Sequence, residues 1–250
     1  MLKFYFYNFS SQTSAESMIS QINDMCEKTK HLKRMEDIML FVCVPTASLE
    51  MVCKSIEDRE LVKISSQCFS AANISGMPTA KQLVEIGAHM GLTGLTDRRF
   101  LLGETDEFCR DGLGELLSLG KKALLCVGET KQIKDSDTAR QEIAKQVTTG
   151  VSKVPMEAVY RMGILYRPLW EFEGEKTDLA YALDMIDVIK QASNQALPEL
   201  PEPLPVFYGG EVSTQQLKEL FDKQQIDGIF VDQSRMTSEE FVKMINDIGA

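Results

Sequence analysis

Short apolar runs alternate eight times with amphipathic stretches along this chain, and this alternation constrains the fold more than any other feature. The apolar runs have the length of buried strands and occupy residues 3–8, 37–44, 62–67, 89–95, 122–127, 159–167, 205–208 and 226–231. The segments between them include four clear helix-period stretches, at 15–30, 107–119, 179–195 and 238–248. Continuous apolar strands joined by helices indicate a parallel sheet covered by helices. Eight such units favour an α/β fold closed into a (β/α)8 barrel, also called a TIM barrel, with a single domain over residues 1–250.

The composition excludes several classes of partner. The formal net charge is −10, and a nucleic-acid-binding protein needs a basic face to displace counterions. No stretch approaches the ~20 apolar residues that a membrane span requires, and the first apolar run is too short for a signal peptide. Six scattered cysteines without a C-x-x-C pair indicate buried free thiols in a reducing compartment. We therefore expect a cytoplasmic protein with no nucleic-acid or membrane partner.

In a barrel of this kind, reactive side chains lie at the C-terminal ends of the strands and in the loops that follow them. The segments that form this rim are 8–10, 67–69, 95–99, 128–129, 167–176, 209–211 and 232–234. Neither histidine belongs to it, because His31 lies among basic residues at a helix end and His89 lies at a strand start. Their separation matches no metal-ligand pattern. We expect no catalytic histidine, no metal and no cofactor.

Five segments resemble triosephosphate isomerase, in the order and spacing of that family. They are 94–99 (GLTDRR), 103–107 (GETDE), 126–129 (CVGE), 164–170 (ILYRPLW) and 208–210 (YGG). The resemblance covers essentially the whole chain and implies the barrel fold. It also implies an enzyme that moves a proton between neighbouring carbons of a triose phosphate, with a glutamate base and a neutral histidine electrophile.

The side chains that carry the family's chemistry are replaced in this sequence. The resemblance places the glutamate base at Arg167, and an arginine stays protonated near neutral pH. It places the histidine at Leu95, which has no donor for an oxyanion, and the catalytic lysine at Ser10. Only Asn8 matches the family at these positions. The resemblance therefore implies loss of the isomerase reaction.

The positions that resemble the family's phosphate site are also altered. Gly209 and Gly210 are kept, but Glu211 follows them where the family has a serine. After the last strand, Asp232 and Gln233 replace a pair of glycines whose amides would hold an anion. A phosphosugar is accordingly a poor candidate ligand for this rim.

Acidic residues gather around the same positions. The lid glycine of the family falls on Glu173, which we expect to face Glu211 and Asp232 where a dianion would sit. At ~4 Å and an effective dielectric constant of ~20, each like-charge contact opposes binding by about 4 kcal/mol. The acids of this group are Glu171, Glu173, Glu175, Glu211 and Asp232. They could bind a cation or an amine, or form a solvated acidic loop that no longer closes, and we favour the loop.

Other positions suit the scaffold rather than the chemistry. Arg98, Arg99, Glu104 and Glu129 match residues that form buried ion pairs and hydrogen bonds beneath the site in the family. We expect Arg167 to pair with Asp97 or Glu129 across the barrel mouth. The loop at 67–76 is shorter than the family loop that enters a partner subunit, so we expect a homodimer with an altered interface.

The sequence supports three functions. The first is a barrel without isomerase activity that binds an unknown small molecule or a protein partner. The second is an isomerase or lyase of altered substrate, in which Asp97, Glu129, Glu211 or Asp232 serves as base and Arg167 stabilises an oxyanion. The third is a divergent but active triosephosphate isomerase of glycolysis. The expected ligand-binding positions are Asn8, Asp97, Glu129, Arg167, Glu173, Gly209, Gly210, Glu211, Asp232 and Gln233.

Overall fold

The computed structural model describes residues 2–30 and 38–249. Its parallel strands form a closed barrel in which each pairs with its sequence neighbours and β8 returns to β1. The strands are β1 (Lys3–Asn8), β2 (Ile38–Val44), β3 (Val62–Ser66), β4 (Met90–Thr93), β5 (Lys122–Val127), β6 (Met162–Tyr166), β7 (Val206–Tyr208) and β8 (Gly228–Asp232). The predicted (β/α)8 barrel is confirmed.

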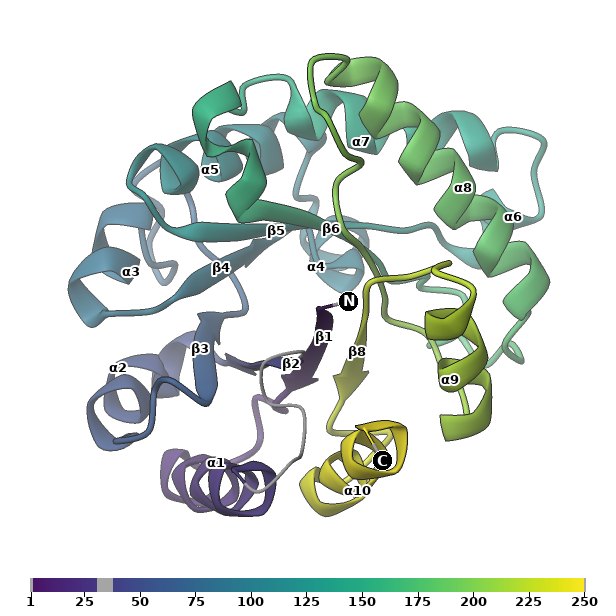
Figure 1. The fold of residues 1–250 in the computed structure, drawn as a ribbon. Helices are drawn as coiled ribbons and strands as arrows, with labels where there is room; N and C mark the ends of the chain where they lie inside the picture. The colour runs from purple at the N-terminus through teal and green to yellow at the C-terminus, as the bar shows by residue number, and fades with distance from the viewer. Residues whose placement is uncertain (1, 31–37, 250) are drawn as a thin grey trace.

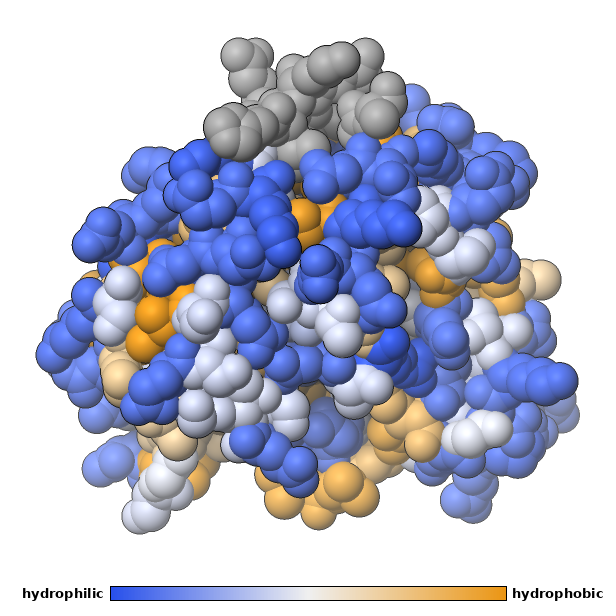
Figure 2. Space-filling view, turned by 90° about the horizontal axis from the view of Figure 1, so that it is seen from below, coloured by the Kyte–Doolittle hydropathy of each residue, from blue (hydrophilic) through white to orange (hydrophobic). Residues whose placement is uncertain are grey.

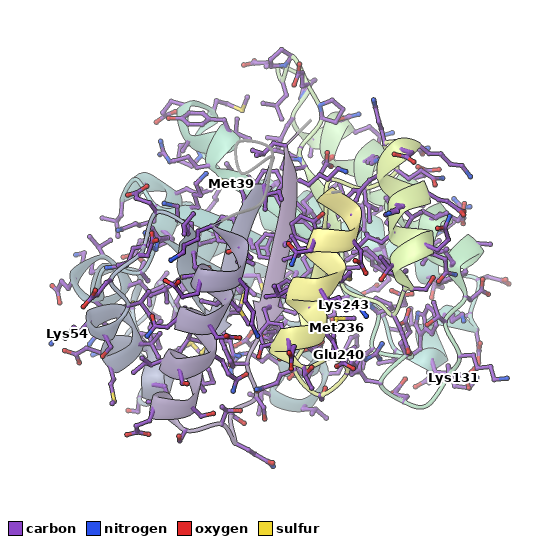
Figure 3. The ribbon with its side chains drawn as sticks, turned by 60° about the horizontal axis from the view of Figure 1, so that its bottom comes forward. Met39, Lys54, Lys131, Met236, Glu240 and Lys243 are labelled. Atoms are coloured by element: carbon purple, nitrogen blue, oxygen red, sulfur yellow. The ribbon has the colours of Figure 1, made fainter. Side chains whose placement is uncertain are left out.

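The helices lie outside the ring of strands, as Figure 1 shows in a view along the barrel. They are α1 (Ala15–Thr29), α2 (Thr46–Ser55), α3 (Ala80–Ile86), α4 (Thr96–Leu102), α5 (Asp106–Ser118), α6 (Lys131–Lys134), α7 (Ala139–Val151), α8 (Leu179–Ala196), α9 (Thr214–Asp222) and α10 (Ser238–Gly249), with a 3₁₀ helix η2 (Met156–Arg161). The helices α1 and α10, from the two ends of the chain, pack against each other. Figure 3 shows Glu240 at the start of α10, where its carboxylate accepts hydrogen bonds from the backbone N–H and hydroxyl of Thr237.

Alternation along the strands divides the core into two parts. One set of side chains fills the barrel interior, including Phe6, Phe41, Leu165 and Phe207. The opposite set packs beneath the helices in a larger cluster. Because side chains on adjacent strand positions point to opposite faces, both sets must be apolar, which explains the continuous apolar runs. A filled interior leaves the strand ends as the place for a site.

Several predicted strand boundaries differ from the structure, most clearly those of β6 and β4. Residues 159–161 belong to η2 rather than to the strand that follows, so β6 begins at Met162. The strand β4 ends at Thr93, and Leu95 instead precedes α4 as its N-cap residue. His31 and the predicted strand residue Asp37 lie outside the described residues. Five of the six cysteines are buried as expected, whereas Cys68 is only partly buried.

The face of the molecule seen in Figure 2 carries mostly polar side chains. Seen from below in Figure 2, apolar residues lie in separate patches among hydrophilic ones. Within residues 2–30 and 38–249, no helix has the length and apolar character to cross a membrane.

His89 lies directly before β4, on the opposite end of the barrel from the rim. Its Nδ1 accepts a hydrogen bond of 3.0 Å from the backbone N–H of Ile64, which favours the neutral ring. Burial, together with the positive charges of Arg59, Lys63 and Lys121, lowers the pKa of His89 from 6.5 to about 4. Its place and its contacts fit a structural role.

We expect the protein to lose about 1 kcal/mol of stability through this histidine when the pH falls from 7 to 5. Between pH 6.5 and 4 the unfolded imidazole binds a proton that the folded one does not, so unfolding is favoured as pH falls. The value of about 1 kcal/mol is reduced to account for the partial exposure of the imidazole ring to solvent. Urea unfolding of the protein and of a His89→Asn variant at both pH values measures it. An equal pH dependence in the two proteins would contradict it.

Candidate functional site

A polar cavity of about 240 Å³ opens at the C-terminal end of the barrel. Seven predicted site residues line it: Asn8, Ser10, Leu95, Asp97, Arg167, Asp232 and Gln233. The other five, Glu129, Glu173, Gly209, Gly210 and Glu211, do not border this cavity. The ends of β1, β6 and β8 and the start of α4 therefore bring one part of the predicted set together and leave the rest outside.

Arg167 follows β6 and crosses the mouth of the barrel. Its Nε lies 3.3 Å from Asp232 Oδ2, its Nη2 lies 3.4 Å from Asp232 Oδ1, and its Nη1 lies 3.4 Å from Asp97 Oδ1. Its side chain is 8% exposed. The expected pair with Asp97 is confirmed, and Asp232 is a second partner that the sequence did not predict. Burial acts to lower the pKa of the guanidinium, but nearby Asp232, Cys126 and Asp97 raise it by more than burial lowers it. The pKa of Arg167 is therefore raised above its usual value, and the side chain stays charged.

The side chain of Asn8 donates to Asp232, and Gln67 in turn holds Asn8. Asn8 Nδ2 donates to Asp232 Oδ1 at 2.7 Å, and Gln67 Nε2 donates to Asn8 Oδ1 at 2.8 Å. Gln67 Nε2 also lies 2.6 Å from the carbonyl oxygen of Phe9. Asn8 is therefore held from both sides, and its retention has a structural explanation in this chain.

The remaining polar groups of the cavity are partly used by the chain itself. Gln233 Oε1 accepts from the backbone N–H of Ser10 at 2.9 Å and from Thr13 Oγ1 at 2.7 Å. Leu95 is buried and presents only hydrocarbon. Asp97 is different, because its side chain is 49% exposed while it borders the cavity. With Asp97, Asp232 and Arg167 ionised, the formal charge of these three cavity residues is −1.

Glu129 lies beneath the rim rather than in the cavity. Its Oε1 accepts hydrogen bonds from Tyr166 OH at 2.8 Å and from Trp170 Nε1 at 2.9 Å. Its Oε2 has no hydrogen-bond partner among the described residues. Burial raises the pKa of this carboxyl, and the two hydrogen bonds oppose the rise. The alternative pairing of Arg167 with Glu129 was wrong, because Glu129 instead anchors the aromatic residues of β6 and the loop after it.

The predicted ring of Glu173, Glu211 and Asp232 does not form. Glu173 Oε2 accepts from the backbone N–H of Lys131 at 2.8 Å, at the start of α6. The side chain of Glu211 is 76% exposed, and Asp232 is occupied by Arg167. Each carboxylate lies near a different partner: the N–H of Lys131, the guanidinium of Arg235 and the guanidinium of Arg167. The three acids therefore lie apart.

Glu171, which was not part of the predicted ring, is the acid that lies buried beside the end of β7. Its side chain is 1% exposed, so the preference for a solvated acidic loop was wrong for Glu171, whereas Glu173 in the same loop is exposed. Glu171 Oε1 accepts from Tyr208 OH at 2.6 Å, and Oε2 accepts from the backbone N–H of Glu211 at 2.8 Å. Arg235 Nη1 donates to the same Oε2 at 3.1 Å. The sequence showed an acidic loop but not which of its acids turns inward, and it gave no signal for Arg235.

Phe172 joins this cluster to the cavity. The guanidinium carbon of Arg167 lies 4.1 Å from the centre of the Phe172 ring, and that of Arg235 lies 4.0 Å from it. Both distances are within the range of cation–π attraction. The loop after β6 is therefore fixed by Trp170, Glu171 and Phe172 in succession.

Ion pairs beneath the site match the scaffold prediction. Arg98 Nη2 lies 2.7 Å from Glu104 Oε1, and Arg99 pairs with Asp106. Arg99 also donates to the carbonyl oxygen of Cys126 at 3.2 Å, which ties α4 to the end of β5. These contacts position Asp97 and Leu95 without entering the cavity.

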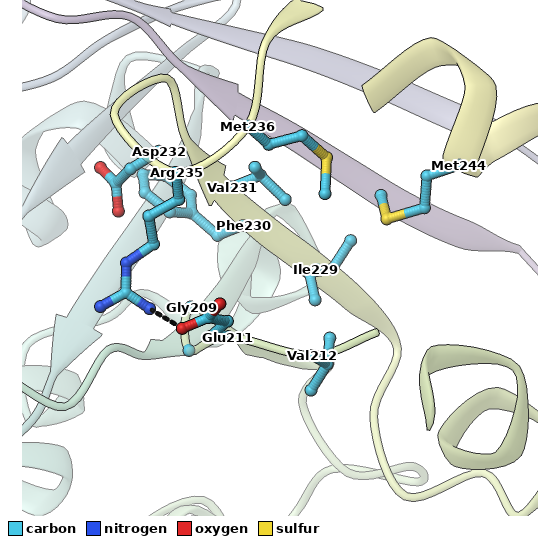
Figure 4. Close-up of a pocket in the computed structure, with 11 residues that line it drawn as sticks. Gly209, Glu211, Val212, Ile229, Phe230, Val231, Asp232, Arg235, Met236 and Met244 are labelled. Carbon is cyan, nitrogen blue, oxygen red and sulfur yellow. Dashed lines mark ion pairs between the residues drawn. The ribbon is translucent and has the colours of Figure 1, made fainter. Parts of the chain in front are cut away.

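A second cavity, of about 90 Å³, lies between β7, β8 and α10. Figure 4 shows Met236, Met244, Ile229 and Val212 on its apolar side. On its other side Arg235 Nη1 lies 3.9 Å from Glu211 Oε2, and the two loops that carry them meet there. Across residues 2–30 and 38–249, no three His, Cys, Asp or Glu side chains are grouped to hold a metal ion.

Comparison with known proteins gives a consistent result. Residues 5–248 match the sequence profile of the family described as triosephosphate isomerase. The chain is 24% identical over 241 residues to a triosephosphate isomerase of Aquifex aeolicus, covering 95% of this chain and 96% of that protein. It is 26% identical to those of Trichormus variabilis (95% of this chain, 94% of that protein) and Aspergillus oryzae (96% and 95%).

Proposed function

Because the chain belongs to the triosephosphate isomerase family, we propose that it keeps the family's barrel and has lost the family's reaction. The observation that carries this proposal is the buried ion pair of Arg167 with Asp232 and Asp97 at the position where the resemblance places the base. A guanidinium that stays charged cannot remove a proton from carbon. Leu95, at the position of the electrophile, cannot polarise a carbonyl group.

The cavity suits a small polar molecule that is neutral or cationic. Its three ionised side chains sum to a charge of −1, and Ser10, Ser11 and Gln67 are among the uncharged polar residues that line it. A phosphosugar fits poorly, since Glu171 already takes the amide N–H that follows Gly210. The cytoplasmic location and the homodimer with an altered interface stay predictions.

Relocated acid–base chemistry is the second candidate, and the structure favours one residue for it. Asp97 is a half-exposed carboxylate on the cavity wall, with Arg167 3.4 Å away as a cation for a developing oxyanion. Glu129 and Glu211 lie outside the cavity, and Asp232 accepts hydrogen bonds from Asn8 and Arg167. If a metabolite screen finds a substrate that the unaltered protein converts, loss of that conversion in an Asp97→Asn variant would identify this chemistry.

We expect no measurable interconversion of glyceraldehyde 3-phosphate and dihydroxyacetone phosphate. Each missing general acid or base contributes about 10²–10⁴-fold, so kcat/KM is expected at least about 10⁴-fold below that of the Aspergillus oryzae relative. The protein should be produced in a host without its own isomerase, because traces of that enzyme would dominate the rate. Conversion at a rate near the relative's, and lost in an Arg167→Met variant, would refute the proposal.

A further inference from the structure

The carboxylate of Glu171 is held as an anionic ligand is held. Three donors from two other loops and a strand converge on it: Tyr208 OH at 2.6 Å, the backbone N–H of Glu211 at 2.8 Å and Arg235 Nη1 at 3.1 Å. The carbonyl oxygen of Glu171 accepts a further bond of 3.1 Å from Arg235 Nη2. A carboxylate with a guanidinium, an amide N–H and a hydroxyl around it, away from solvent, is a strong charge-assisted arrangement.

The backbone at the end of β7 is shaped to this carboxylate. A Cβ atom on Gly210 would lie 2.1 Å from Tyr208 OH and 2.5 Å from Glu171 Oε1. Glycine at this position is therefore required for the hydroxyl and the carboxylate to meet. Arg235 is 21% exposed and its guanidinium stacks on Phe172, so it too is oriented before any external ligand arrives.

The residues on either side of Glu171 are also fixed by contacts at the mouth of the barrel. Trp170, directly before Glu171, is fully buried and donates to Glu129, and Phe172, directly after it, lies between two guanidinium groups. The backbone N–H groups of Phe172 and Glu173 donate to the carbonyl oxygen of Leu169 at 2.8 and 3.1 Å, which makes the loop a compact turn. Glu171 lies in the middle of this turn, so its carboxylate joins the turn to Tyr208, to the loop after β7 and to the loop after β8.

We propose that Tyr208, Arg235 and the amide of Glu211 form an oxyanion site whose occupant is the chain's own Glu171, which holds the loop closed. An intramolecular carboxylate competes at a high effective concentration, so a free anion at millimolar concentration does not displace it. Removing the carboxylate frees the donors for a small tetrahedral oxyanion. This inference concerns the loop and the anion site, and it holds whether or not the cavity beside Arg167 catalyses a reaction.

Titration with inorganic phosphate tests the site. We expect millimolar binding to a Glu171→Ala variant, and binding at least tenfold weaker to the unaltered protein. A Glu173→Ala variant is the matched control, since Glu173 is in the same loop but bonds to Lys131. It should bind as weakly as the unaltered protein. Adding Arg235→Gln to Glu171→Ala should abolish binding. Equal binding by all variants, or by none, would overturn the proposal.

Trp170 reports on the closed loop, because it is the single tryptophan of the chain and is fully buried. In a Glu171→Gln variant, which keeps the side-chain volume, we expect acrylamide to quench its fluorescence at least threefold more strongly. The circular dichroism spectrum should be unchanged, and phosphate should partly reverse the quenching. Glu173→Gln should leave the quenching unaltered. Unaltered quenching in Glu171→Gln would show that the carboxylate does not hold the loop.

Discussion

Replacement of Arg167 by methionine is expected to lower the free energy of unfolding by about 3–5 kcal/mol, measured by urea denaturation at pH 7. Methionine keeps the apolar stem of the side chain and removes the guanidinium with its charge and its donors. The loss leaves Asp232, whose side chain is 9% exposed, as a buried carboxylate without a cation. Removing one partner of a buried pair costs more than the pair contributes, because the remaining charge is still desolvated. The stacking of Arg167 on Phe172 is lost as well.

A second substitution separates charge from packing. Asp232→Asn keeps an oxygen that can accept from Asn8 Nδ2 and removes the unpaired charge. The Arg167→Met/Asp232→Asn double variant is therefore expected to recover more than half of the lost stability. Asp97→Asn alone should cost less than about 1 kcal/mol, since that carboxylate is half exposed. A double variant no more stable than Arg167→Met would show that packing, and not the buried charge, explains the loss.

The fold was predictable because the barrel needs apolar residues on both faces of every strand. Eight short apolar runs leave few alternatives, and helices such as α5 and α8 agree with the prediction to within one residue at each end. The errors lie where local and tertiary preferences compete. Val159 and Tyr160 are typical strand residues, yet they belong to η2, which begins directly after Pro155.

The site was predictable only as far as the rim. The strand ends and the loops after them give the positions of Asp97, Arg167 and Asp232. The pair of Arg167 with Asp97 was expected, whereas Asp232 was expected to face other acids. The sequence does not give side-chain direction in a loop without period. Glu171 and Glu173 lie two residues apart with the same chemistry, yet one is buried on Tyr208 and the other binds the backbone of Lys131.

A Gly128→Ala substitution is expected to destabilise the protein by about 3 kcal/mol or more. A Cβ atom there would lie 2.2 Å from the carbonyl oxygen of Arg167 and 3.0 Å from Thr96 Oγ1. Neither strand end can move away easily, because Gln146 holds the N–H and C=O of Gly128 by two bonds of 3.0 Å. Arg167 N–H in turn donates to the carbonyl oxygen of Val127 at 2.9 Å. The overlap therefore falls on backbone, which side-chain rotation cannot relieve.

Gly120→Ala is the control variant, because it measures the cost of a left-handed backbone conformation without any steric overlap of the added methyl group. Gly120 has a φ of +80°, and no atom lies within 4 Å of the position that an alanine methyl group would take, so its substitution carries only the left-handed penalty of about 1–2 kcal/mol. Both variants would be compared by urea denaturation. If Gly128→Ala costs no more than Gly120→Ala, the close approach of β5 to Arg167 is not a constraint on the site. If it costs the larger amount, the backbone that places Arg167 between Asp97 and Asp232 depends on a glycine that the family motif at 126–129 supplies.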